Sequence, residues 1–239
     1  IFRSGQTQTQ ISVNVGGTLI DESQHHRILG MVVNNTLTWH DHVYGSGALL
    51  QSVNQRVGAL KRVARYVPPT ALSTIANAVI CSKVRYGITI YGDVCMKEQD
   101  PLPAASKDIQ LALKQAMCVV SRCRLVDRIS IANLVSRSKI NTFNRMSAEE
   151  KLSQIWCAVH TTNNPLSHII RRETTEATSS LRSSARGDLQ LHSRSSVGQN
   201  NFPETAIRVW NETSLAIRHQ TKKTTAKKEM KLFINTLPL

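Results

Sequence analysis

The chain has 239 residues, 41% hydrophobic and only 5% aromatic, which is enough for one or two domains with an aliphatic core. No apolar run approaches the roughly 18 residues of a membrane-spanning helix, so we expect no membrane partner. There are 30 Lys and Arg against 16 Asp and Glu, a net charge of +14, and residues 111–239 carry +11 of it. This excess favours a polyanionic partner, nucleic acid before anionic membrane.

The five cysteines are unevenly spaced, which argues against a secreted disulfide scaffold. They predict a reducing, intracellular location, cytoplasmic, nuclear or both. Cys118 and Cys123 are five residues apart and should diverge on a helix, whereas Cys157 and His160 would share a face. We expect buried free thiols rather than a zinc site built from these four residues.

The first part of the chain, residues 9–33, has the pattern of β-structure. Val13 and Val15 alternate with polar residues, as in a half-buried strand. The pair Gly16-Gly17 suits a tight turn, and Ile28–Val33 reads as a further strand that ends at the turn-forming pair Asn34-Asn35.

Helical periodicity begins near residue 47, where apolar residues recur on one face up to Ala64. Pro68-Pro69 ends that helix and begins the next, which runs towards Ile80. Residues 84–92 are either β-prone or an irregular continuation. A loop at 98–107 leads into a third helix, predicted over 105–121.

The second half is also predicted to be helical. Ser130 is expected to cap a short helix, and Ser147-x-x-Glu150 has the pattern of a capping box at the start of another. Residues 171–201 contain ten Ser or Thr, five Arg and no aromatic residue, so they indicate a mobile basic linker. A last amphipathic helix is expected to begin near Thr225.

His40-Asp41-His42 suggests a metal site, because alternate residues of a strand point the same way. This would support a metal-dependent hydrolase. A third ligand is not evident, however, and the segment connects a turn to a helix, where an acidic residue favours the helix N-terminus. We therefore favour a structural role for this triplet and keep the hydrolase as an alternative.

The sequence lacks the usual catalytic and cofactor motifs, including Gly-x-Ser-x-Gly, the phosphate-binding Walker loop and any Asp-Asp pair. Two-metal polymerases and nucleases need clustered carboxylates, so we predict no catalytic residue, metal or cofactor bound by this chain. Binding chemistry remains. Basic side chains on helices can follow the phosphates of a duplex, although they can also form an ordinary solvated surface. The candidate contacts are Arg56, Lys61, Arg62 and Arg65 in the first long helix, and Lys222, Lys223, Lys227 and Lys228 near the C-terminus.

Several segments occur in an order typical of one family. "RILGMVVNNTLTWHDHV" (27–43) is similar to the pattern YLGV-x-LD-x-x-LTW-x-x-H. Two helical stretches (49–92 and 108–160) follow, and then "AIRVWNETSLAIRHQTKKTTAKKEMKLFINTLPL" (206–239), which is similar to R-x-WN…AKK-x-x-K-x-F-x-x-TLP. Together they resemble the palm end, thumb and C-terminal region of reverse transcriptases from non-LTR (LINE-type) retrotransposons.

This resemblance implies a fragment of an RNA-directed DNA polymerase whose Mg²⁺-binding aspartates belong to an upstream palm. The fragment itself would be non-catalytic and would grip the RNA/DNA template–primer, with the upstream palm and fingers as further partners. Gly30 would lie in a strand beside the primer, where its small size admits a close backbone approach. Asn34 replaces the family's Asp, and the Cys/His zinc knuckle of some members is missing.

We thus predict an α+β, mostly α-helical fold with a short N-terminal antiparallel β-hairpin, a helical thumb-like bundle and a helical C-terminal region. The alternatives are a stand-alone basic nucleic-acid-binding or interaction module and a non-functional transposon relic. The predicted divisions are the palm remnant (1–43), the thumb-like region (44–125), the helical C-terminal region (126–170), the linker (171–201) and the terminal helical segment (202–239).

Overall fold

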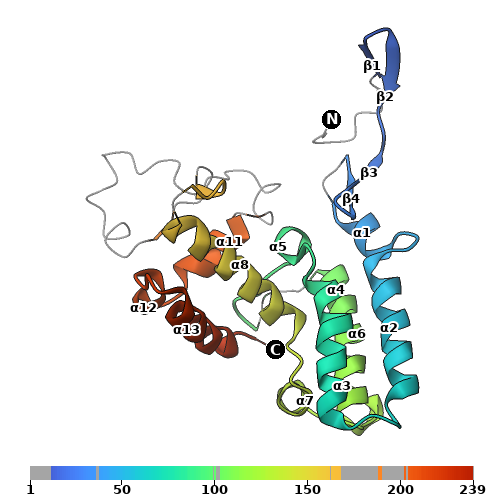
Figure 1. Ribbon diagram of the computed structural model, residues 1–239, viewed down its shortest axis with the longest axis vertical. Coiled ribbons are helices and arrows are strands. Elements are labelled where there is room, and N and C mark those ends of the chain that lie inside the picture. Colours follow the sequence, from blue (N-terminus) through green and yellow to red (C-terminus); the bar gives the residue numbers. More distant parts are fainter. Residues whose placement is uncertain are drawn as a thin grey trace.

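Two short antiparallel hairpins begin the described part of the chain, and helices form most of the rest, which confirms the predicted α+β, mostly helical class (Figure 1). The computed structural model describes residues 12–35, 38–98, 100, 103–161, 163–167, 188–189, 202 and 204–238. The first hairpin pairs β1 (Ser12–Val15) with β2 (Thr18–Asp21), and the second pairs β3 (His25–Ile28) with β4 (Met31–Asn34).

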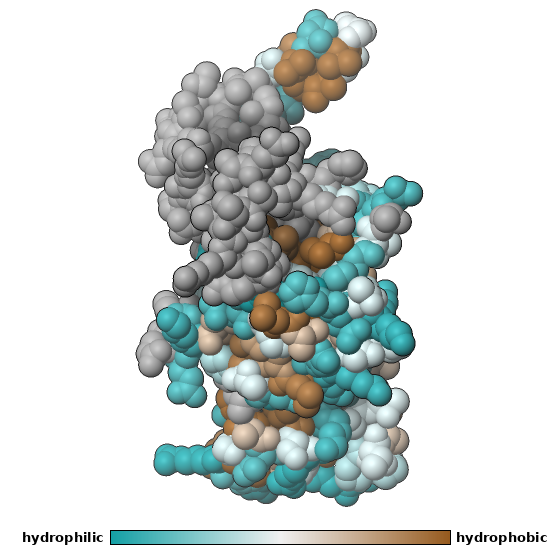
Figure 2. Space-filling view, turned by 90° about the vertical axis from the view of Figure 1, so that its left-hand side faces the viewer, coloured by the Kyte–Doolittle hydropathy of each residue, from teal (hydrophilic) through white to brown (hydrophobic). Residues whose placement is uncertain are grey.

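The β1–β2 hairpin stands away from the helices, and hydrophobic side chains cover much of its surface (Figures 1 and 2). Gly16 and Gly17 both have positive φ, which confirms the predicted tight turn. The expectation of a half-buried strand was wrong, because Val13 is 49% and Leu19 64% exposed. The alternating pattern reflects pairing across the hairpin, where Val13 faces Ile20, rather than packing on a core.

An antiparallel helical bundle follows, and its core contains Val53, Leu72 and Leu113 among other aliphatic residues. Residues 84–92 are helical except for a turn at Tyr86 and Gly87 and the end at Gly92, so the irregular continuation is confirmed and the β alternative was wrong. Gly87, at φ +73°, adopts the left-handed conformation that separates the two short helices there. The elements are α1 (His40–Tyr44), α2 (Leu49–Val63), α3 (Pro69–Ala76), the π-helix η1 (Asn77–Cys81), α4 (Ser82–Arg85), α5 (Ile88–Tyr91) and α6 (Ala104–Val120).

The remaining helices pack around a second core, which includes Trp156, Trp210 and Met230. Ser130 accepts a hydrogen bond from the Asn133 amide, which confirms the predicted cap. These elements are the 3₁₀-helix η2 (Leu125–Asp127), α7 (Ile131–Ser138), α8 (Phe143–His160), α11 (Glu204–Asn211), α12 (Leu215–Arg218) and α13 (Lys223–Thr236).

The predicted capping box at Ser147 was wrong, because α8 begins four residues earlier, at Phe143. Its N-cap is Thr142, whose hydroxyl accepts a hydrogen bond from the Arg145 amide, and Ser147 is fully buried inside the helix. The sequence pattern was misleading because the first turn of α8 includes Asn144 and Arg145, which are polar and yet buried.

Helix α8 belongs to both cores and crosses between the two groups of helices (Figure 1). Its first turns place Phe143 and Met146 in the bundle core. Further along, Leu152 and Trp156 lie in the second core, against α11 and α13. A single helix therefore determines how the two halves of the described chain pack together.

Lys151 connects α8 to the short helix α5. Its side chain is fully buried, and the ammonium donates hydrogen bonds to the carbonyl oxygens of Thr89 at 2.8 Å and Gly92 at 2.7 Å. These carbonyls lie at the C-terminal end of α5, where the helix dipole favours a cation. Burial lowers the pKa of Lys151 to about 8, while Asp93 acts in the opposite direction.

Asn144 and Arg145 connect the start of α8 to the C-terminal end of the chain. The Asn144 side-chain amide donates to the carbonyls of Cys95, at 3.0 Å, and Pro238, at 3.1 Å. The Arg145 guanidinium donates to the Asn235 carbonyl at 2.7 Å, at the end of α13. Arg145 thus satisfies a carbonyl in the last turn of α13, which lacks an intrahelical donor, and Asn144 joins the loop after α5 to the segment that follows α13.

The predicted basic linker (171–201) lies outside the described residues except for Asp188 and Leu189. Asp188 forms an ion pair with the buried Arg218. The Leu189 backbone exchanges two hydrogen bonds with the Asn211 side chain, each 2.8 Å long. The linker stays a prediction, as do the proposed domain boundaries.

The pH dependence of stability tests the buried position of Lys151. Its pKa is about 8 in the folded chain and near 10.5 when unfolded, so the unfolded chain binds more protons between these pH values. The free energy of unfolding should therefore rise by about 3 kcal/mol across this window through this residue alone. Urea unfolding of Lys151→Met should show a smaller rise with pH than the wild type. An equal rise in both proteins would contradict the burial of the charge.

Candidate nucleic-acid interface

The basic residues predicted along the first long helix divide into two kinds. Lys61, Arg62 and Arg65 are exposed at the C-terminal end of α2 and just beyond it. The Arg65 guanidinium lies 4.7 Å from the centre of the Tyr66 ring, and Tyr66 is itself 74% exposed. These three cations are available to a partner.

Arg56, in contrast, is half-buried and has a structural role. Its guanidinium donates a hydrogen bond to the carbonyl of Val79, in the π-helix η1. This hydrogen bond joins α2 to η1. Arg56 also lines an apolar groove of about 340 Å³ between α2 and the α3–η1 segment.

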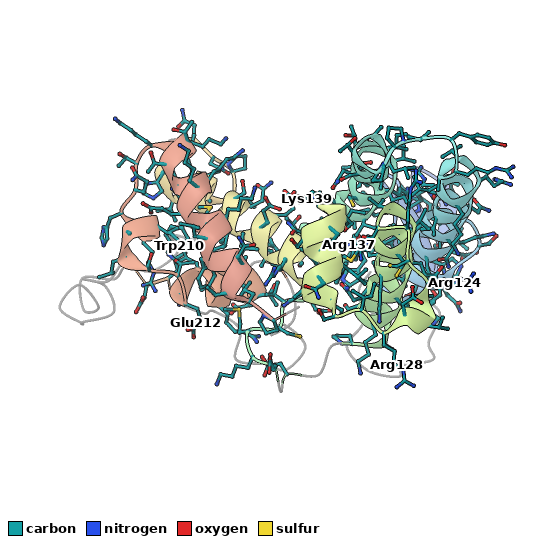
Figure 3. The ribbon with its side chains drawn as sticks, turned by 90° about the horizontal axis from the view of Figure 1, so that it is seen from below. Arg124, Arg128, Arg137, Lys139, Trp210 and Glu212 are labelled. Carbon is teal, nitrogen blue, oxygen red and sulfur yellow. The ribbon has the colours of Figure 1, made fainter. Side chains whose placement is uncertain are left out.

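Further cations, which sequence reasoning missed, surround the same end of the bundle. They come from the connection between α6 and α7 and from the end of α7, which lie about 60 residues further along the chain. Figure 3 shows four of them spread over this end of the molecule. We call the exposed set the basic tip: Lys61, Arg62, Arg65, Arg122, Arg124, Arg128, Arg137 and Lys139.

Two arginines of the basic tip join its segments. Arg122 donates a hydrogen bond to the Val67 carbonyl at 3.2 Å, which connects the end of α6 to the turn between α2 and α3. Arg137 donates to the Ser121 carbonyl at 2.7 Å, which connects α7 to the end of α6. These bonds hold the segments of the tip together, although the segments are distant in sequence.

The electrostatic balance of the tip is strongly positive. Segments 61–70 and 121–139 contain eight Lys and Arg and a single acidic residue, Asp127. Its carboxylate accepts a hydrogen bond from the Arg124 amide at 2.7 Å. Helices α2, α6 and α7 all end here, and their dipoles favour some of this positive charge. The dipoles of three helix ends compensate only part of the charge of eight cations. The remaining positive charge faces solvent or a partner.

The C-terminal lysines form a separate surface. Lys222, Lys223, Lys227 and Lys228 are all exposed at the start of α13. Lys227 and Lys228 line a cavity of about 430 Å³ that also includes an acidic pair on α8. The structure thus does not join these lysines to the basic tip, and their predicted contact with nucleic acid stays a prediction.

The acidic pair, Glu149 and Glu150, is engaged by a cation from the bundle. Arg85 approaches Glu149 at 2.6 Å and Glu150 at 2.7 Å. Burial acts to lower the pKa of Arg85, but the two carboxylates outweigh it and raise that pKa. Lysines that face this cavity therefore meet a mixture of charges, unlike those of the basic tip.

The β3–β4 hairpin, whose turn contains Gly30, lies near the start of α2, away from the end where α2 leads into α3 (Figure 1). The expectation that Gly30 sits inside a strand was wrong: Leu29 and Gly30 form the turn between β3 and β4, both with positive φ. Such a turn favours glycine because it has no Cβ. The hydroxyl of Tyr86 donates to the Leu29 carbonyl at 2.6 Å and holds this turn on the bundle.

The His40-Asp41-His42 triplet begins the short helix α1 rather than continuing a strand, so the two imidazoles lack the shared orientation on which the metal-site alternative depended. His42 is buried with its ring 5.1 Å from that of Tyr91, and burial lowers its pKa, with Lys83 and Arg27 adding to the effect. His40 is exposed. Among the described residues there is no group of three or more potential metal ligands, here or elsewhere.

Asp41 has the structural role expected of the triplet, but by a different contact. It lies in the first turn of α1, and its carboxylate accepts a hydrogen bond from the Asn34 side-chain amide at 3.3 Å. Asn34 also bonds the Thr38 hydroxyl at 2.6 Å. The β4 strand and α1 are thereby fixed to each other at the point where the fold changes from β to α.

Comparison with models of known protein families, with curated proteins and with solved structures found no match to this chain. Within the part of the chain that the structure describes, none of the helices combines the length and apolar character needed to cross a membrane.

The two kinds of α2 cation should respond differently to truncation. Arg56→Ala removes the donor to the Val79 carbonyl and packing against the groove, and should lower the free energy of unfolding by about 1–2 kcal/mol. Lys61→Ala, in the same helix, should change it by less than about 0.5 kcal/mol. Urea denaturation followed by circular dichroism measures both values. Equal effects would show that Arg56 does not support the π-helix.

Proposed function

We propose that this chain binds an RNA/DNA duplex through its phosphate backbone and that the basic tip is the main contact. The observation that carries the proposal is the gathering of eight Lys and Arg with one acidic residue at one end of the bundle. Neutralising duplex phosphates releases condensed counterions, which supplies sequence-independent affinity. The ligand of such a surface is a polyanion with regularly spaced charges.

The composition of the tip favours backbone contact over stacking on separated bases. Stacking platforms need several exposed aromatic rings along a groove. Segments 61–70 and 121–139 contain a single aromatic residue, Tyr66, and the Arg65 guanidinium already lies over its ring. Arginines and lysines from three helix ends can instead meet phosphates on both strands of a duplex.

The family resemblance supplies the wider role. In a non-LTR reverse transcriptase, the α2–α3 region would act as the thumb, and the chain would hold the template–primer while upstream palm and fingers carry out synthesis. Mg²⁺ would belong to the upstream aspartates. The physical role proposed for this chain, binding without catalysis, rests on its charge distribution and stands whether or not the resemblance is correct.

Neutralisation of the tip tests this proposal. Binding of a fluorescent RNA/DNA hybrid should weaken steeply as salt rises from 50 to 200 mM. The variant Lys61→Gln/Arg62→Gln/Arg65→Gln should bind at least about tenfold more weakly and reduce the slope of log K against log salt by about 2–3, close to one per lost phosphate contact.

The matched control removes the same charge elsewhere. Lys222→Gln/Lys223→Gln/Lys227→Gln changes the net charge equally but leaves the tip intact. A much smaller loss in this variant supports the tip as the contact. An equal or larger loss would move the contact to α13, and wild-type protein with no affinity, or with no salt dependence, would overturn the proposal of duplex binding itself.

A further inference from the structure

Cys118 and Cys123 were expected to diverge, and the structure brings them together instead. Helix α6 ends at Val120, and Arg122 turns the chain back with φ +53°, in the left-handed region. The Cys123 amide then donates to the Cys118 carbonyl at 3.0 Å, and the Arg122 amide donates to the Val119 carbonyl at 3.2 Å.

This pair of hydrogen bonds defines a Schellman motif at the end of α6. A hydrophobic contact between the two residues that occupy the positions of Cys118 and Cys123 frequently accompanies this motif. Here both are cysteines. The Cys123 thiol also reaches the Cys118 carbonyl, at 3.7 Å from sulfur to oxygen.

The two thiols differ in their surroundings. Cys118 is buried, whereas Cys123 is partly exposed beside the basic tip. Burial, followed by its contact with the Cys123 thiol, raises the pKa of Cys118 to about 11. Cys123 is therefore the thiol that a dissolved oxidant reaches first, and Cys118 is the neighbour that can react with the product.

We propose that Cys118 and Cys123 form a site of reversible oxidation to an intramolecular disulfide, with a peroxide as the oxidant. A disulfide requires Cα atoms within a few ångströms of each other, and the backbone hydrogen bond between residues 118 and 123 holds them in a tight turn. The other cysteines, Cys81, Cys95 and Cys157, are distributed over other elements and are free thiols.

The chemistry requires two steps. The Cys123 thiolate attacks one oxygen of hydrogen peroxide, the O–O bond breaks, and the products are a sulfenic acid on Cys123 and, after protonation, water. The Cys118 sulfur then attacks the Cys123 sulfur, an S–S bond forms, and hydroxide leaves with the thiol proton as a second water. The two thiols lose two electrons in total, and the peroxide gains them.

The disulfide would cross-link the last turn of α6 to the segment that carries Arg122 and Arg124 of the basic tip. The disulfide would close a short loop and restrict the backbone of the turn that carries these two side chains. A dithiol reductant would break the disulfide and make this backbone free to move again. The inference rests on the geometry of the helix end and does not depend on nucleic-acid binding.

Peptide mapping tests the proposal directly, because trypsin cleaves after Lys114, Arg122 and Arg124. Native protein is treated with hydrogen peroxide, the remaining thiols are alkylated in denaturant, and the digest is analysed without reduction. We expect alkylated cysteines to fall from five to three, as residues 115–122 and 123–124 appear as one disulfide-linked species that dithiothreitol separates. Five alkylated cysteines after oxidation, or links from Cys123 to any other cysteine, would overturn it.

Two single variants keep the test independent of folding defects. Cys118→Ser should leave Cys123 as a sulfenic acid that dimedone traps, and should abolish the linked peptide. Cys157→Ser, the matched control, should form the linked peptide as the wild type does. The proposed site would be contradicted if Cys123 in the Cys118→Ser variant formed a disulfide with another cysteine as abundantly as the wild type forms the 118–123 link. Such a result would show that oxidation is not selective.

Discussion

The packing of the two helical groups depends on buried polar side chains of α8, above all the ammonium of Lys151. A charged group without solvent is costly unless donors and acceptors around it are matched. Lys151 meets this condition by donating to two carbonyls at the end of α5, which otherwise would lack partners. The interaction therefore satisfies both the ammonium and the two carbonyls. It also specifies one position of α5 against α8, because hydrophobic contacts alone define a position less precisely.

Arg145 and Asn144 extend the same principle to the C-terminal end of α13. Arg145 donates to the Asn235 carbonyl in the last turn of α13, and Asn144 donates to the Pro238 carbonyl just after it. Helix α8 thus acts as a connector whose polar residues select its neighbours and whose apolar residues supply most of the burial. The basic tip is built differently, since Arg122 and Arg137 each use a hydrogen bond to a carbonyl and remain on the surface.

Apolar periodicity was sufficient to predict α2, α3, α6 and α13, because each buries one face on a neighbour. It failed at the start of α8, where Asn144 and Arg145 look like loop residues and their partners lie about 50 and 90 residues away. The contact between Cys118 and Cys123 was missed for a local reason. The chain reverses at an arginine in the left-handed conformation, where sequence reasoning expects glycine or asparagine.

The candidate site was predicted only in part, for a similar reason. Lys61, Arg62 and Arg65 were visible as a basic run, but the other half of the tip comes from residues 122–139, which the sequence places in a different segment. The chain runs back through α3, η1 and α4, so that α6 packs beside α2 in the same direction and both helices end at the tip. Arg56 belonged to the same predicted group, yet its contact with the Val79 carbonyl could not be foreseen, because π-helical geometry has no clear sequence signal.

Hydrogen–deuterium exchange of the wild-type chain, with and without a short RNA/DNA hybrid, tests the central claim most directly. The account predicts slower exchange on binding in residues 61–70 and 121–139, where backbone amides lie beneath the basic tip, and little change in the β1–β2 hairpin. Protection confined to other segments, with unchanged exchange in both tip segments, would contradict it.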